Sequence, residues 1–110
     1  MTVKELAEAC GFSVVVAGEN EDRNVSGAYA CDLLSWVIGR AAEDSALITV
    51  MTNVNVVAVA AMADLSCIIL TEGVSLDANA LEKAKQNDIP VLSSDMTTFD
   101  TCVTVSKALS

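Results

Sequence analysis

Histidine is absent from this chain of 110 residues, and proline occurs only once. Without histidine, the chain lacks the usual general base of enzymes and the commonest zinc and haem ligand in proteins. Positive charge is also scarce, with 6 Lys and Arg against 15 Asp and Glu, a formal net charge of −9. Because affinity for nucleic acids depends on Lys and Arg that neutralise phosphates, we expect no nucleic-acid partner.

Long apolar runs are missing as well. No run reaches the roughly 18–20 residues that a membrane-spanning helix needs, so we expect no membrane partner. The first residues, Met1–Glu5, lack the charged and apolar regions of a signal peptide, which predicts a cytoplasmic protein. Hydrophobic residues nonetheless make up 53% of the chain. This fraction argues against disorder and predicts one folded domain over residues 1–110.

Four cysteines stand far apart, at Cys10, Cys31, Cys67 and Cys102. None belongs to a Cys-x-x-Cys pair, so the spacing typical of zinc ribbons and bacterial ferredoxins is absent. A chain without an export signal is not expected to hold disulfides. We interpret the four as reduced thiols that are buried as small hydrophobic side chains. A cluster bound by all four is the alternative; we otherwise expect no metal and no cofactor.

Helical and strand patterns alternate along most of the chain. Helices are predicted over about 3–10, from Asp32 through Ala41, over 54–64, over 77–87 and from Thr97 or Thr98 to Leu109; strands over 13–18, 25–31, 46–50, 66–70 and 90–93; and a polar turn over Glu19–Asn24. This order predicts an α/β three-layer sandwich. A mostly parallel sheet of about five strands would be flanked by helices on both faces.

Local signals define the ends of several of these helices. Thr2 and Glu5 form a capping box for the first helix, and Gly11 is a plausible C-terminal stop. Asp32 is expected to cap the second helix. The segment 54–64 is apolar nearly all round, which favours a buried helix, although its valines leave a strand possible.

The closing helix is expected to turn four side chains towards the core. These are Phe99, Cys102, Val103 and Leu109.

Polar side chains follow two of the predicted strands. In open α/β sheets, ligands bind beyond the carboxyl ends of the strands, so these loops are the best candidate ligand site. The residues at this edge are Thr49, Thr52, Asn53, Asn55, Ser94 and Asp95. The alternative is that they only cap the helices that follow. No Walker phosphate loop or dinucleotide-binding glycine motif is present.

A catalytic function is not predicted, because no histidine is available to activate a Ser, Cys or Thr nucleophile. Arg23 most simply pairs with carboxylates of its own turn, Glu19–Asn24. The alternative is that Arg23 holds an anionic ligand.

Trp36 lies on the apolar face of its predicted helix, where it either packs into the core or anchors a protein interface. The high apolar content of so short a chain favours a homodimer that buries a self-complementary patch. We expect this interface around Trp36, Val37, Val57 and Met62.

Several stretches in order along the chain carry a resemblance to a known family. They are Asp22–Tyr29, Asp32–Arg40, Ile48–Ala60, Cys67–Gly73 and Leu92–Asp95. Together they resemble the DRTGG domain family, and more closely its small standalone members in anaerobic bacteria. The pentapeptide that names the family is present only in part, as Asp22-Arg23 with Gly27.

The resemblance implies a fold similar to the N-terminal domain of HPr kinase/phosphorylase, without that kinase's phosphate loop. In relatives, the domain accompanies CBS domains in a regulated pyrophosphatase or is attached to phosphotransacetylases, as a regulatory or dimerisation module. The implied function is a non-catalytic, homodimeric regulatory domain that acts through protein partners. A sensor for a small ligand such as an adenine nucleotide is the main alternative. A redox-partner or cluster-binding protein is a further one, suggested by the iron–sulfur genes that accompany standalone members.

Overall fold

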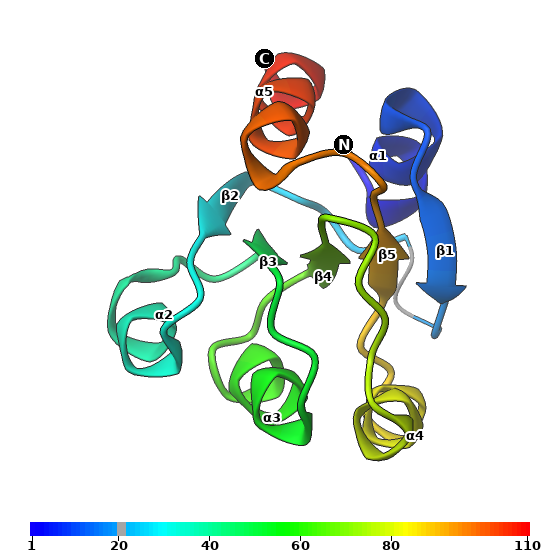
Figure 1. Ribbon diagram of the computed structural model, residues 1–110. Helices are drawn as coiled ribbons and strands as arrows, with labels where there is room; N and C mark the ends of the chain where they lie inside the picture. The colour runs from blue at the N-terminus through cyan, green and yellow to red at the C-terminus, as the bar shows by residue number, and fades with distance from the viewer. Residues whose placement is uncertain (20–21) are drawn as a thin grey trace.

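One sheet with the strand order β1-β5-β4-β3-β2 lies at the centre of the protein (Figure 1). The computed structural model describes residues 1–19 and 22–110. The strands in this part are β1 (Ser13–Val16), β2 (Gly27–Ala30), β3 (Ser45–Thr49), β4 (Cys67–Leu70) and β5 (Val91–Ser93). Strands β2 to β5 are parallel, and β1 pairs antiparallel with β5. The predicted mostly parallel sheet is therefore confirmed.

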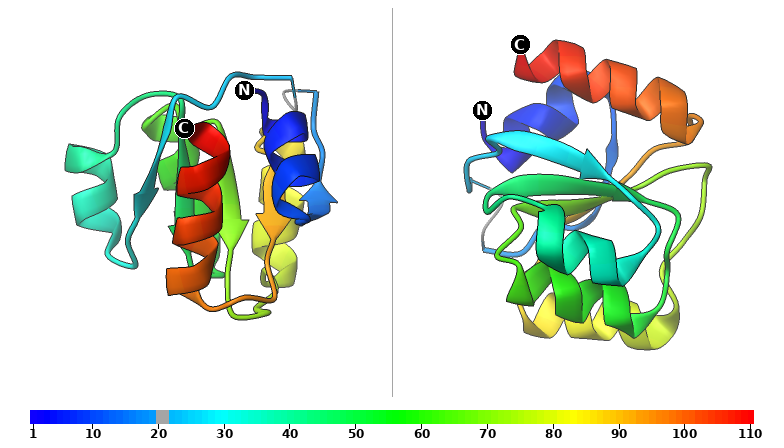
Figure 2. Two further views of the ribbon diagram at one scale, coloured as in Figure 1. Left: turned by 90° about the horizontal axis from the view of Figure 1, so that it is seen from above. Right: turned by 90° about the vertical axis from the view of Figure 1, so that its left-hand side faces the viewer.

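Helices cover both faces of the sheet. They are α1 (Val3–Cys10), α2 (Leu34–Arg40), α3 (Val54–Met62), α4 (Ala78–Gln86) and α5 (Thr98–Leu109). Helices α1 and α5 lie on one face, and α2, α3 and α4 lie on the other (Figures 1 and 2). This arrangement is the three-layer sandwich expected from the sequence. No helix in the described part of the chain is both long and apolar enough to span a membrane.

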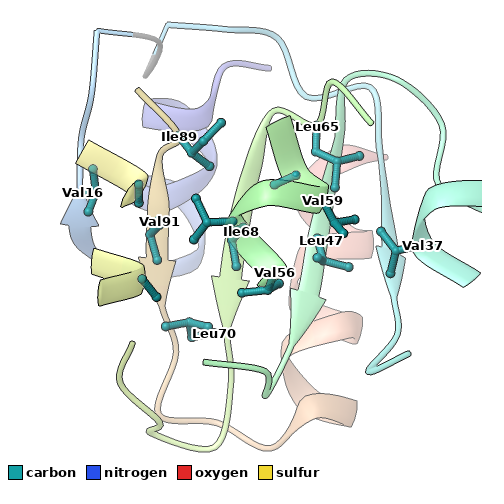
Figure 3. Close-up of a cluster of buried hydrophobic side chains, with 14 residues drawn as sticks. Val16, Val37, Leu47, Val56, Val59, Leu65, Ile68, Leu70, Ile89 and Val91 are labelled. Carbon is teal, nitrogen blue, oxygen red and sulfur yellow. The ribbon is translucent and has the colours of Figure 1, made fainter. Parts of the chain in front are cut away.

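The core has two halves because successive strand residues point to opposite faces of the sheet. Leu47 and Ile68 point towards α3 and α4 (Figure 3), whereas their neighbours Ile48 and Ile69 point towards α1 and α5. Every residue of β3 and β4 is buried. Burial on both faces explains why these strands are continuous apolar runs rather than alternating ones.

Local capping signals are confirmed at three helices. The Thr2–Glu5 capping box opens α1, and Gly11 ends it with a left-handed φ of 72°. The side chain of Asn53 caps α3 by accepting a hydrogen bond from the Asn55 amide, and that of Thr97 caps α5 in the same way. The apolar segment 54–64 contains α3, so its interpretation as a helix is confirmed and the strand alternative is wrong.

The predicted cap of α2 is wrong. Leu33 holds the N-cap position and makes no side-chain bond to the helix. The carboxylate of Asp32 instead accepts hydrogen bonds from Thr49 and from the Val50 amide, at the end of the adjacent strand β3. A tertiary contact has taken the side chain that a local rule assigned to the helix.

The inward face of α5 also differs from the prediction. Phe99 is 75% exposed and Val103 is 37% exposed, while Thr101 and Val105 are the buried side chains of the helix. Thr101 can point inwards because a second hydroxyl, that of Ser94, pairs with it in the core. The polar turn predicted over Glu19–Asn24 contains residues 20 and 21, which lie outside the described residues.

Candidate functional site

The carboxyl ends of the parallel strands meet at one edge of the sheet, and a buried hydroxyl lies at the end of β3. Thr49 Oγ1 donates to Asp32 Oδ1 at 2.7 Å and accepts from the Met51 amide at 3.1 Å. The same Asp32 oxygen accepts from the Val50 amide at 3.0 Å. The hydroxyl of Thr49 therefore both donates and accepts a hydrogen bond within the domain.

Two further hydroxyl pairs connect the residues that follow β4 and β5 to helix α5. Thr71, directly after β4, pairs with Thr98 at 2.7 Å between their Oγ1 atoms. Ser94 Oγ lies 2.9 Å from Thr101 Oγ1 and accepts from the Met96 amide at 3.1 Å. Thr71, Ser94 and Thr101 are all buried. Because buried polar groups are costly unless paired, these bonds hold the loops in one arrangement.

A carboxylate of the chain itself lies at the N-terminus of α5. Glu72 Oε2 accepts a hydrogen bond of 2.7 Å from the amide of Thr98, the first residue of that helix. The partial positive charge at a helix N-terminus favours anions. The place where an external anion would bind at α5 is therefore filled by Glu72.

The six residues predicted at this edge have different environments. Thr49 and Ser94 are buried and bonded within the domain, so they are not on a ligand-accessible surface. Thr52 is partly exposed, and Asn53, Asn55 and Asp95 are exposed. A ligand-binding role for these four stays a prediction. Thr71 could have been found from the sequence, because it directly follows the buried apolar strand β4, much as Thr49 ends the buried strand β3.

Arg23 lies away from this edge, near the amino ends of β3 and β4. Its guanidinium donates to Asp44 Oδ1 at 2.6 and 3.0 Å and to the Asp64 carbonyl at 2.7 Å, and it forms a 3.0 Å ion pair with Asp64 Oδ1. Asp44 and Asp64 precede β3 and β4 and have positive φ values of 65° and 57°. Burial lowers the pKa of Arg23, but the bonds to the two aspartates outweigh it, and the pKa is raised.

This geometry corrects the prediction for Arg23. Among the described residues, its side-chain partners lie 21 and 41 residues downstream and not in its own turn. Arg23 is also not grouped with the other predicted ligand residues, which lie at the opposite ends of the strands. Neither Asp44 nor Asp64 carried a sequence signal for this role.

The four cysteines are free and differ in burial. Cys67 is buried, and burial raises the pKa of its thiol to about 12. Cys10, Cys31 and Cys102 are partly exposed, so the prediction of burial is confirmed for Cys67 only. Burial also raises the pKa values of Cys10 and Cys102. Within residues 1–19 and 22–110, no group of three Cys, Asp or Glu residues is placed to hold a metal ion.

Two open pockets have largely apolar walls. One, of about 380 Å³, lies between β2 and α5. The other, of about 260 Å³, lies between β1, the end of β4, the segment 74–76 and α4. The second adjoins the edge with the hydroxyl pairs, because Leu70 and Ser93 end strands β4 and β5.

Comparison with known proteins identifies the family. A model of the DRTGG domain matches residues 5–108. The chain belongs to the DRTGG domain family. Almost the whole chain is thus the domain itself, and the resemblance seen in the sequence is confirmed. No curated protein matches the sequence.

A solved structure supports the same fold for this DRTGG domain. It contains the CBS and DRTGG domains of the regulatory region of Clostridium perfringens pyrophosphatase, complexed with the activator diadenosine tetraphosphate. The similarity has a TM-score of 0.77 at 17% identity and covers 98% of this chain and 47% of the other. The domain therefore spans about half the length of that structure's chain. In that protein, the DRTGG domain is part of a regulatory region.

Proposed function

We propose that this DRTGG domain is a non-catalytic regulatory module that acts as a homodimer and through protein partners. The observation that carries the proposal is an imbalance between surface and interior. Large apolar side chains are exposed, while the buried polar side chains at the carboxyl end of the sheet, and Arg23 at the amino end, are bonded within the domain.

The exposed apolar side chains of the helices include one Trp, one Met and one Phe. Trp36 of α2, Met62 of α3 and Phe99 of α5 are 47%, 73% and 75% exposed. The chain has only one Trp and two Phe, and the Trp and one of the Phe are exposed rather than buried in its own core. Aromatic residues and Met are enriched in protein interfaces. The guanidinium of Arg40 lies 3.7 Å from the centre of the Trp36 ring, an arrangement that orders both side chains.

Two residues of the interface expected from the sequence are not available to a partner. Val37 and Val57 are fully buried in the core beside α3. Trp36 and Met62 remain as exposed candidates. The correction follows from helix geometry, because adjacent residues on a helix do not share a face.

The polar groups give no support for catalysis. The carboxylates of Asp32 and Glu72 accept backbone hydrogen bonds, and the hydroxyls of Thr49, Ser94 and Thr101 are buried and paired. A nucleophile needs an adjacent base or a lowered pKa. Among the described cysteines, the resolved pKa shifts are all upwards.

Light scattering on the purified domain tests the proposal. We expect a species of twice 11.4 kDa at micromolar concentration. An 11.4 kDa monomer throughout this range would overturn the dimeric module. If the wild type is a dimer and Trp36→Asp or Met62→Asp gives monomers, the interface lies on α2 or α3.

A second function, sensing of an adenine nucleotide, is favoured by one observation. The pocket of about 260 Å³ has an apolar lining from Val15, Leu70, Leu76 and Leu81, suited to a flat base. A structure similar in fold was complexed with diadenosine tetraphosphate. The exposed carboxylates of Glu72 and Asp95 near the same edge oppose phosphate groups.

Thermal unfolding with AMP, ATP and diadenosine tetraphosphate tests this second function. A ligand at 100 times its dissociation constant stabilises the folded state by about 2.7 kcal/mol. The shift should disappear in Ser75→Trp, which fills the pocket, and persist in Ser106→Trp, which lines the other one. No shift with any of the three nucleotides would exclude the sensor.

A further inference from the structure

Strand β2 is only partly covered on the face that carries α1 and α5. The strand lies at the edge of the sheet, beside α5 and on the side away from α1 (Figure 2). Ala28 and Ala30 are exposed, and they form part of the pocket of about 380 Å³. The remaining walls come from Ile48 and from α5, through Cys102, Val105, Ser106, Leu109 and Ser110. Such a volume accommodates a small organic group.

Helix α5 carries a second apolar stripe beside this pocket. Residues three or four apart share a helix face, and this spacing relates Phe99, Cys102, Val103, Ser106 and Leu109. None of the five is fully buried, and Phe99, Val103 and Ser106 are exposed. Thr101 and Val105 are the buried side chains of the helix, while Cys102 and Leu109 pack only partly against the core. The stripe contains no charged residue, and part of its apolar surface remains outside the core.

The stripe contains both a projecting side chain and a cavity. Phe99 is 75% exposed near the start of α5, and the pocket is centred about seven residues later. At 1.5 Å per residue, the two are about 10 Å apart along the helix. Two such surfaces match when one is reversed, because each Phe99 then faces the other copy's pocket. This is the arrangement of an isologous, two-fold interface.

We propose that a second copy of this chain packs its α5 antiparallel against this stripe, with Phe99 of each copy in the other's pocket. The two-fold axis then passes near Cys102, halfway between Phe99 and the centre of the pocket. The small side chains of Cys102 and Ser106 allow the two helices to approach closely.

Charge on α5 favours the same antiparallel arrangement. Asp100 lies in the first turn of the helix and Lys107 in the last, two turns apart on one side. Reversal of the second helix brings the carboxylate of each copy opposite the ammonium of the other. A parallel pair would instead place like charges together. Such rim charges fix orientation more than they add affinity.

The proposal rests on the proposed homodimer and specifies its surface. Two single variants address the projecting side chain and the cavity separately. Phe99→Asp and Ser106→Arg should each raise the dimer dissociation constant by at least about 30-fold, the effect of a central interface residue. Met62→Asp is the matched control, because Met62 is 73% exposed on α3, at the opposite face of the sheet. This control should leave the dimer unchanged.

A mixture of the two variants provides a rescue experiment. The intact Phe99 of the Ser106→Arg variant can enter the intact pocket of the Phe99→Asp variant. At the second contact, the carboxylate introduced by Phe99→Asp faces the guanidinium introduced by Ser106→Arg. Equal amounts of the two monomeric variants should therefore form a heterodimer. Circular dichroism should show both variants folded, because each site is exposed.

Cross-linking tests the position of the two-fold axis. A short bismaleimide, each ring of which adds one thiol across its double bond, should join two wild-type chains through Cys102. Cys102→Ser should lose the product, and Cys31→Ser should retain it. Cys67 is buried and serves as an internal negative control.

The outcomes separate the two levels of the proposal. A monomeric wild-type domain overturns the homodimer and this interface together. A wild-type dimer that resists Phe99→Asp and Ser106→Arg and gives no Cys102 cross-link overturns the interface alone. In that case a dimer broken by Trp36→Asp or Met62→Asp keeps the proposed function on a different surface.

Discussion

At the amino ends of β3 and β4, the loops are joined by charge, whereas at the carboxyl ends they are joined mainly by neutral hydroxyls. One guanidinium, that of Arg23, bridges Asp44 and Asp64 from partly exposed positions. At the other end, Thr71 pairs with Thr98 and Ser94 with Thr101. Both sets of contacts connect neighbouring loops of the sheet. The contacts at the amino ends use charged groups, and those at the carboxyl ends use mainly hydroxyls.

The difference shows where the polar residues of this DRTGG domain are used. At both ends of the sheet, the side chains in these contacts connect loops to one another. Among the described residues, no buried side-chain nitrogen or oxygen lacks a hydrogen-bond partner. The contacts of Arg23 should respond to salt, whereas the hydroxyl pairs Thr71–Thr98 and Ser94–Thr101 should not.

Replacement of Arg23 should have the largest effect. Arg23→Met removes the hydrogen bonds to both aspartates and should cost about 2 kcal/mol of unfolding free energy, as expected for bonds to charged groups. Urea unfolding measures the loss. Lys85→Met, at an exposed lysine, should cost less than about 0.5 kcal/mol. In about 1 M salt, the gap between wild type and Arg23→Met should narrow, and an unchanged gap would contradict the charged bridge.

Cys67, at the amino end of β4, should make the domain sensitive to alkali. Its pKa rises from 9.0 to about 12 on folding, mainly through burial. The unfolded thiol therefore ionises first, so this contribution to stability is complete below pH 9.0 and is lost as the pH rises towards about 12. The slope is about 1.4 kcal/mol per pH unit. Urea unfolding across this range should show the slope reduced in Cys67→Ala but retained in Cys31→Ala.

The substitution Thr101→Val tests whether the hydroxyl contacts differ from the Arg23 contacts in their response to salt. The change keeps the shape of the side chain and removes its bond to Ser94, so it should cost about 1 kcal/mol. This loss should be the same at low and high salt. Ser106→Ala, on the exposed face of α5, is the control. In a double-mutant cycle with Ser94→Ala, strictly additive losses would contradict the pair.

The smallest effect is expected from a substitution of Glu5. Its carboxylate closes the capping box of α1, beside the segment that carries Arg23. The hydrogen bonds from the Thr2 backbone and side chain lower the pKa of Glu5 below 4.5. A lowered pKa stabilises the fold above pH 4.5 and loses this effect as the pH falls through the folded value. Glu5→Gln should therefore unfold at slightly lower temperature than wild type near neutral pH. The two melting temperatures should converge in acid, and a gap that stays constant down to low pH would contradict this role of Glu5.

The sequence predicted the features that depend on neighbours in the chain. The Thr2–Glu5 capping box and the left-handed Gly11 need only a few adjacent residues, and both were found as expected. The buried strands were recognisable because burial on both faces leaves a continuous apolar run.

The features that depend on distant neighbours were missed. Asp32 has the right chemistry for a cap, yet it bonds 17 residues away because β2 and β3 lie side by side. Phe99 seemed a core residue by its hydrophobicity, but the buried Ser94 makes a polar residue, Thr101, acceptable at the inward position. For the candidate site, the sequence located the carboxyl edge but could not show that Thr49 and Ser94 are already bonded there.

The antiparallel contact between β1 and β5 has a consequence for how the chain acquires its structure. Strand β1 pairs only with β5 among the described strands, through contacts such as Ser13 with Ser93. During synthesis, the first strand therefore has no place in the sheet until almost the whole chain has been made. The segments between them can assemble earlier, because β2, β3 and β4 pair in the order in which they emerge. Closure of the β1 edge is then a late event, and pairing of such distant segments slows folding.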